Sequence, residues 1–160
     1  MKIKPKHIII SVSAILSILL LKKMATTKFL KITQSNKKRG CDVKGCGHFG
    51  ASRGDRKHNG LDIVTIVGEP IYAPVSGKVV RHSFPYSDDL KYTGLLLENS
   101  DLKIHIWYFK PIVSAGTTVK AGDLLGYAQD LTKKYKGITN HVHLEVKDQK
   151  GKLINPETLV

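Results

Sequence analysis

The chain has 160 residues and a formal net charge of +13, which is unevenly distributed. Residues 1–40 hold ten basic and no acidic residues, whereas residues 41–160 hold sixteen basic and thirteen acidic residues, a net charge of only +3. Because the excess belongs mostly to the N-terminal segment, and because the common nucleic-acid recognition motifs are absent from the sequence, composition argues against a nucleic-acid-binding protein.

The N-terminal segment contains an unbroken apolar run at residues 8–21, with lysines on both sides of it. Fourteen residues fit the core of a signal peptide. As a helix they would span about 21 Å, short of the roughly 30 Å hydrocarbon core of a bilayer, although flanking lysines can extend such a span. No clear A-x-A cleavage site follows the run. We therefore expect residues 1–23 to be a hydrophobic helix that serves either as a signal peptide or as a membrane anchor.

Residues 24–39 are lysine-rich with interspersed Thr, Ser and Asn, a composition typical of a basic flexible linker. Residues 40–160 then fit a single domain, which we expect to be monomeric. The leader predicts an exported protein, periplasmic or extracellular, with residues 8–21 as an inner-membrane anchor if they are retained. Its positive charge favours an anionic membrane surface or an anionic polymer such as a cell wall.

The two cysteines, Cys41 and Cys46, open the predicted domain. Export favours a disulfide between them. The alternative is a metal site with His48 as a third ligand, which is the weaker interpretation because only two thiols and one imidazole lie nearby.

The next motif is His-Asn-Gly-Leu-Asp at residues 58–62, which runs into a β-branched strand at residues 63–67. His58 and Asp62 are four residues apart, so both face the same side of an extended chain, and Gly60 lets the backbone bend between them. An imidazole and a carboxylate on one face are suitable metal ligands.

The middle of the chain is a series of short apolar segments separated by turn residues. We expect two short strands within 71–80, a hairpin of 94–98 with 102–109, and glycine turns within 119–126. Residues 129–139 are polar and predict a short helix or a mobile loop. With almost no helical periodicity, the pattern predicts an all-β domain.

Residues 140–146, Asn-His-Val-His-Leu-Glu-Val, carry the strongest functional signal. On a strand, His141, His143 and Glu145 share one face. A hydrolytic zinc site keeps three protein ligands and one open position, so we expect one Zn²⁺ on His58, Asp62 and His143. His141 would then act as the base toward the metal-bound water, and Glu145 would orient a ligand.

This set of motifs resembles the lysostaphin-type zinc metallopeptidases of bacterial cell walls. The family's H-x3-D and H-x-H motifs match residues 58–62 and 141–143, its V-x-x-G-x-x-x-G segment matches 119–126, and its closing G-K-x-x-x-P matches 151–156. Residues 40–50 and the phrase Tyr-Phe-Lys-Pro at 108–111 are similar to the leukocyte cell-derived chemotaxin subgroup and its bacterial relatives.

The resemblance covers residues 40–160. It implies a compact antiparallel β-sheet, barrel-like domain of the duplicated hybrid motif class. It also implies zinc bound by His58, Asp62 and His143, catalysis by His141, and peptidoglycan or cell-wall peptides as partners. Tyr86, Tyr92 and Tyr108 are candidates for lining the substrate groove.

One position departs from the family pattern. The peptidases carry a second catalytic histidine in a Y-x-H-L phrase, and this sequence has Lys110 there. His105 has the opposite strand parity and should point away unless a bulge shifts the register. Lys110 could still serve as a cationic donor to an oxyanion.

Two hypotheses therefore stand. The first is an exported zinc metalloendopeptidase that cleaves peptidoglycan cross-links, with weak or unusual activity. The second is a non-catalytic, zinc-stabilised, chemotaxin-like binding module. Lys110 favours the second hypothesis, whereas the retained His141 favours the first.

Overall fold

The computed structural model describes residues 29–160, in which the regular elements are short strands and two 3-10 turns. The strands are β1 (Cys41–Asp42), β2 (Gly45–Cys46), β3 (Leu61–Val64), β4 (Pro70–Tyr72), β5 (Gly77–Ser83), β6 (Gly94–Glu98), β7 (Leu102–Trp107), β8 (Phe109–Pro111), β9 (Thr118–Val119), β10 (Leu124–Ala128), β11 (His141–Asp148) and β12 (Leu153–Ile154). The turns are η1 (Leu131–Lys133) and η2 (Pro156–Thr158). The all-β prediction is confirmed. Within residues 29–160, none of the helical segments has the length and apolar character to cross a membrane. The predicted N-terminal helix and membrane anchor lie outside the described residues.

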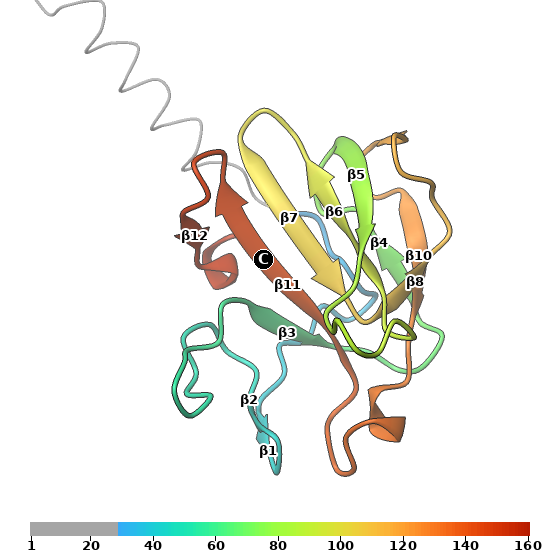
Figure 1. The fold of residues 1–160 in the computed structure, drawn as a ribbon. Helices are drawn as coiled ribbons and strands as arrows, with labels where there is room; N and C mark the ends of the chain where they lie inside the picture. Colours follow the sequence, from blue (N-terminus) through green and yellow to red (C-terminus); the bar gives the residue numbers. More distant parts are fainter. Residues whose placement is uncertain (1–28) are drawn as a thin grey trace, which may run out of the picture.

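The main sheet is antiparallel and has the order β12-β11-β7-β6-β5-β9, with β3 on the same edge of β11 as β12. Figure 1 shows β11, β7, β6 and β5 side by side. A second sheet, β4-β10-β8, lies next to it. The predicted hairpin is present as β6 and β7, and the side-chain oxygen of Asn99 accepts hydrogen bonds from the backbone N–H groups of Asp101 and Leu102 in its turn.

Alternation along β7 and β11 separates a core face from a polar face. The core face carries Leu102, Ile104 and Ile106 of β7 and Val142, Leu144 and Val146 of β11. These six residues join Ile71, Phe109 and Leu125 of the second sheet in one hydrophobic cluster. Each buried aliphatic side chain contributes about 1.5–3 kcal/mol of hydrophobic stabilisation. Because successive strand residues point to opposite faces, the other face of β11 presents His141, His143 and Glu145.

The alternation breaks at Tyr108, which has a φ of +71°, a conformation that bulky residues rarely adopt. The predicted strand 102–109 therefore ends at Trp107, and β8 starts the second sheet at Phe109. His105 pairs with Glu145 and Trp107 with His143 across β7 and β11, so His105 faces the same side as His143. The sequence allowed this orientation of His105 only if the register shifted, and the break at Tyr108 is such a shift.

Residues 29–39, assigned to the flexible linker from their composition, pack against the domain instead. Phe29 and Ile32 are buried in the core cluster. The backbone N–H of Phe29 donates to the carbonyl of Leu159 at 2.8 Å, and that of Arg39 donates to the carbonyl of Asp62 at 2.8 Å. The folded part of the chain therefore includes this segment.

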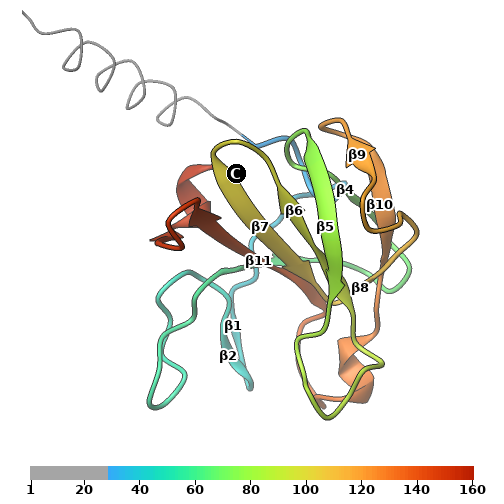
Figure 2. The ribbon, with the colours of Figure 1, turned by 45° about the horizontal axis from the view of Figure 1, so that its top comes forward.

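Three irregular segments project from one end of the main sheet. They are the β1–β2 hairpin, the loop between β5 and β6, and the stretch around η1 (Figures 1 and 2). The first residue of β11, His141, lines one cavity together with residues from all three segments.

Candidate metal centre

Strand pairing brings the predicted ligands together. In the antiparallel pair β3–β11, Asp62 lies directly opposite His143. Gly60 allows the chain before β3 to pass close to β11, because a Cβ at this position would lie 2.3 Å from the Leu144 carbonyl oxygen and 2.6 Å from Nε2 of His143. This close approach carries His58 to the same point as the other two side chains.

The three side chains offer their donor atoms to one common point. Nε2 of His58 lies 3.0 Å from Nδ1 of His143 and 3.2 Å from Oδ1 of Asp62, and His143 Nδ1 lies 2.9 Å from the same Oδ1. Tetrahedral zinc with bonds of about 2.0–2.1 Å separates neighbouring donors by about 3.3 Å. Two imidazole nitrogens and one carboxylate oxygen at this spacing therefore fit a zinc ion with one position left open.

Neighbouring groups hold the two imidazoles in place. His58 Nδ1 lies 2.8 Å from the backbone carbonyl of His48, which only accepts, so Nδ1 carries the proton and Nε2 is left to bind a metal. Trp107 stacks on the His143 ring at a centroid distance of 5.3 Å and an angle of 25°. His48, considered from sequence as a ligand beside the cysteines, contributes its carbonyl instead.

Asp62 is buried and is held as a carboxylate. Burial acts to raise its pKa, but the hydrogen bond with His143 and the neighbouring imidazoles of His58 and His141 outweigh this effect, so its pKa lies far below the usual range. On its other side, the guanidinium of the buried Arg39 lies 2.9 Å from Oδ2. Oδ1 is therefore the oxygen directed at the two imidazoles.

Arg39 connects Asp62 to the β1–β2 hairpin. Its remaining donors go to both carboxylate oxygens of Asp42, at 2.6 and 3.0 Å, and to the carbonyl of Gly45 at 3.0 Å. The Cys41–Cys46 disulfide closes this hairpin, as predicted. The oxygen of Asp42 also accepts the backbone N–H of Thr139 at 2.8 Å, so one carboxylate links the hairpin to the start of β11.

His141 lies beside the ligands as a neutral imidazole. Its Nδ1 donates to the Thr139 carbonyl at 2.7 Å, which leaves Nε2 as the basic atom, 3.5 Å from Oδ2 of Asp62. Burial lowers the pKa of His141 below that of an ordinary histidine. An unprotonated Nε2 in this position can accept a proton from a water molecule at the centre.

A cavity of about 450 Å³ opens onto the three candidate ligands. Two of the three tyrosines expected in a groove, Tyr86 and Tyr108, line it, whereas Tyr92 is buried behind them and packs edge-on against both. Tyr135 lines the cavity too and was not predicted. The hydroxyl of Tyr135 donates to Tyr86 at 3.0 Å, and that of Tyr86 donates to Tyr108 at 3.1 Å.

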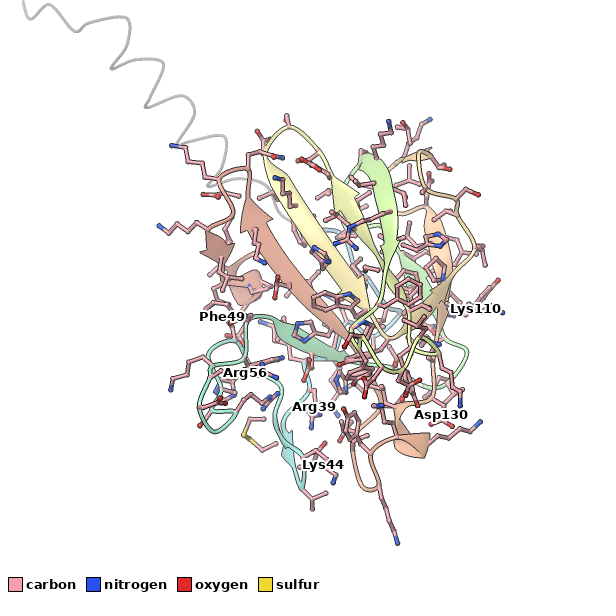
Figure 3. All side chains as sticks on the ribbon, in the orientation of Figure 1. Arg39, Lys44, Phe49, Arg56, Lys110 and Asp130 are labelled. Atoms are coloured by element: carbon pink, nitrogen blue, oxygen red, sulfur yellow. A yellow bond between two sulfur atoms is a disulfide. The ribbon has the colours of Figure 1, made fainter. Side chains whose placement is uncertain are left out.

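Two other predicted site residues have different surroundings. Lys110 is exposed on β8, and Figure 3 shows it at the outer edge of the second sheet, away from Arg39 and Lys44. It is not among the residues that line the cavity. Glu145 is buried at the cavity wall, where its carboxylate pairs with Lys147 at 2.7 Å.

No sequence pattern pointed to Arg39, Trp107 or Tyr135. Each acts through a tertiary contact with a residue at least 23 positions away. Trp107 faces His143 through the regular alternation of β7, and the break that follows it carries Tyr108 into the cavity wall. No sequence pattern marks a tyrosine for positive φ.

Comparison with known proteins places this geometry in a family. A family model described as "Peptidase family M23" matches residues 56–156. Leukocyte cell-derived chemotaxin-2 of Mus musculus is 39% identical over 112 residues, which cover 69% of this chain and 74% of that protein.

Solved structures share the fold at lower identity. A zinc-containing peptidase from Vibrio cholerae is 24% identical with a TM-score of 0.55, over 80% of this chain but only 39% of that one. The catalytic domain of lysostaphin, an antimicrobial peptidase from Staphylococcus simulans, is 20% identical with a TM-score of 0.52, over 72% of this chain and 88% of that one. The family match across most of the folded region, together with the mouse relative, shows that the chain belongs to peptidase family M23.

Proposed function

We propose that the protein is an exported zinc metalloendopeptidase that cleaves peptide cross-links of bacterial peptidoglycan. The observation that carries the proposal is the cluster of His58, Asp62 and His143 beside the neutral imidazole of His141, open to one cavity. The disulfide favours export, because such bonds persist in oxidising compartments. The fold shared with lysostaphin supports a cell-wall substrate.

In this proposal His58, Asp62 and His143 hold Zn²⁺, which when bound would polarise the scissile carbonyl and lower the pKa of a bound water to near 7. Nε2 of His141 accepts the proton of the attacking water and passes it to the leaving amine. Because Asp62 is kept ionised and His58 is held by the His48 carbonyl, the protein presents its donor atoms ready for the ion.

Tyr108 is the group we assign to the oxyanion in place of the missing histidine. Its ring packs edge-on against His141 at a centroid distance of 5.6 Å. Since its hydroxyl oxygen accepts the proton of Tyr86, its own proton is available to a ligand in the cavity. Burial raises the pKa of Tyr108, so the hydroxyl stays protonated and can donate. The exposed Lys110 has no part in this scheme.

The second candidate function is a zinc-stabilised binding module without hydrolysis. It is favoured by lysine in place of the family's second catalytic histidine and by the similarity to chemotaxin-2. Both candidate functions use the same metal ligands, so the property that separates them is whether the protein hydrolyses a peptide.

The deciding experiment measures new amino ends released from purified peptidoglycan by the full chain, with bound zinc quantified in parallel. We expect release that is lost on chelation and restored by zinc. His141→Ala should stop release while retaining about one zinc per chain, whereas His143→Ala should lose both. Stoichiometric zinc with no release from several wall types would instead establish the binding module.

A further inference from the structure

The cavity has two unlike walls. One wall consists of Tyr86, Tyr108 and Tyr135, and the other carries the cationic side chains of Lys44, Arg53 and Arg56. Figure 3 shows Lys44 and Arg56 on the segments that lead to β3, across from Asp130 near η1. The three candidate metal ligands line the same cavity.

Among the three cations of this wall, Arg53 lies nearest the candidate ligands. Its side chain is only 18% exposed, and NH2 lies 3.7 Å from Oδ2 of Asp62, beyond hydrogen-bond distance. NH1 is fully buried and has no hydrogen-bond partner among residues 29–160. Buried donors are nearly always satisfied in folded proteins. Because NH1 is covered, an acceptor in the cavity has to reach the exposed remainder of this guanidinium, which lines the wall.

The protein's own carboxylates do not fill this role. Asp62 is already paired with Arg39, and Arg39 directs its other donors to Asp42 and Gly45. Glu145, the other acidic residue that lines the cavity, pairs with Lys147. In the described part of the chain, neither Lys44 nor Arg56 lies within 4.0 Å of a carboxylate oxygen. The positive charge of this wall is therefore not balanced by the carboxylates that line the cavity.

Two short hairpins fix the positions of these cations. The backbone N–H of Arg53 donates to the carbonyl of Arg56 at 2.9 Å, and His58 lies two residues after Arg56. Lys44 lies in the turn that Cys41 and Cys46 close. NH1 of Arg53 also lies against Gly45, where a Cβ would approach it to 2.8 Å. These two turns therefore hold the three cations at set positions relative to the candidate metal ligands.

We propose that the cavity binds a peptide that carries a carboxylate, and that Arg53, assisted by Lys44 and Arg56, holds that carboxylate beside the candidate metal ligands. The planar fork of a guanidinium matches the two oxygens of a carboxylate. The neutral tyrosine wall contacts the remainder of the peptide. This inference rests on the proposed function for the identity of the cavity as a peptide site and adds the chemical class of its substrate.

The test compares two synthetic peptides of equal length that differ only in one side chain, glutamate or glutamine. Their dissociation constants are measured by calorimetry on the zinc-loaded full chain at low and high salt. We expect the carboxylate peptide to bind about tenfold more tightly at low salt, and the difference to shrink as salt rises. Arg53→Gln should remove the preference. Arg56→Gln, at an exposed position, should reduce it without affecting folding.

Lys152→Gln is the matched control, because it removes an exposed positive charge that is not part of the cavity wall. It should leave the preference unchanged. Zinc content and circular dichroism report whether Arg53→Gln keeps the fold and the centre. Equal binding of the two peptides would overturn the inference. So would Arg53-dependent binding of inorganic phosphate without peptide discrimination, because that would make the wall a phosphate site.

The two proposals fail in different ways. Peptidoglycan hydrolysis together with equal affinity for the two peptides would retain the peptidase and reject the carboxylate site. A carboxylate preference that depends on Arg53, without any hydrolysis, would retain this inference and replace the peptidase with the binding module.

Discussion

At the scale of single residues, Arg39 determines how Asp62 is used. The guanidinium is 2% exposed and touches two carboxylates, Asp62 and Asp42. By occupying Oδ2 of Asp62 it directs Oδ1 toward His58 and His143. A buried cation in this position affects the charge of the centre as well as its geometry.

Arg39→Met should therefore destabilise the protein and weaken its metal site. Removing one partner of a buried ion pair leaves uncompensated charge and typically costs about 3–5 kcal/mol. We expect a loss of this order in urea denaturation of the chelated protein, and a higher dissociation constant for zinc in a competition titration. Arg81→Met, at an exposed position, is the control and should change neither quantity. Unchanged zinc affinity in Arg39→Met would mean that Arg39 does not direct the carboxylate.

Tyr108 can be tested as the oxyanion donor if the protein has the proposed peptidase activity. Tyr108→Phe keeps the ring against His141 but removes the hydroxyl. Loss of one oxyanion donor typically lowers kcat by about 10²–10³-fold. We expect a fall of this size with zinc content unchanged. Tyr135→Phe removes a hydroxyl at the far end of the chain of three tyrosines and should have a much smaller effect. Equal losses in the two variants would contradict the assignment.

His105 makes stability depend on pH. Burial lowers its pKa from 6.5 to about 4, and its Nδ1 is buried without a partner among residues 29–160. A neutral His105 is therefore favoured in the folded state, while the unfolded chain binds a proton below about pH 6.5. The contribution is complete above pH 6.5 and is lost as pH falls toward 4. Denaturation of wild type and His105→Gln across this range should show a shallower decline in the variant; parallel curves would exclude His105 as the cause.

At the scale of elements, the β1–β2 hairpin supports the centre although it contributes no ligand. Its disulfide holds Asp42, which bonds both Arg39 and the backbone N–H of Thr139. Thr139 in turn holds His141 through its carbonyl. A single short element thus reaches a candidate ligand and the candidate base through two separate contacts.

Replacing Cys41 and Cys46 by serine should test this coupling. Loop entropy predicts a loss of about 2 kcal/mol for so small a ring. If the hairpin also positions Asp42, zinc affinity should fall in the same variant, as measured by competition with a chelating dye. A variant that loses stability but binds zinc as wild type does would show that the clip serves the fold alone.

The elements also show what the sequence could predict. The spacing of His141 from His143 implied a shared face, and the β3–β11 pairing places Asp62 opposite His143. His58 was expected on the same strand as Asp62 but lies before β3, and the close approach at Gly60 brings it to the centre. The faces on either side of Tyr108 could not be predicted, because a single residue with positive φ reverses the alternation. Residues 129–139, expected as a short helix or a loop, contain only the 3-10 turn η1 and supply Tyr135 to the cavity.

At the scale of the whole molecule, the N-terminal boundary of the domain lies earlier than composition suggests. Residues 28–38 contain four lysines, but Phe29 and Ile32 among them are apolar and enter the core. The segment contacts both ends of the fold, since the backbone of Phe29 bonds Leu159 and that of Arg39 bonds Asp62. The chain that precedes the predicted ligand motifs is thus tied to the candidate centre.

Ile32 and Leu30 offer a matched test of this arrangement. Ile32 is fully buried, whereas Leu30 is 51% exposed. Ile32→Ala should lower the free energy of unfolding by about 2–5 kcal/mol, the usual cost of a cavity left by a buried aliphatic side chain, while Leu30→Ala should cost much less. Both changes are measured by urea denaturation of the full chain. Equal, small effects in the two variants would mean that residues 29–39 are a linker after all. The expected contrast would mean that this segment belongs to the folded domain. A shortened form of the protein must then begin no later than Phe29 to keep its core.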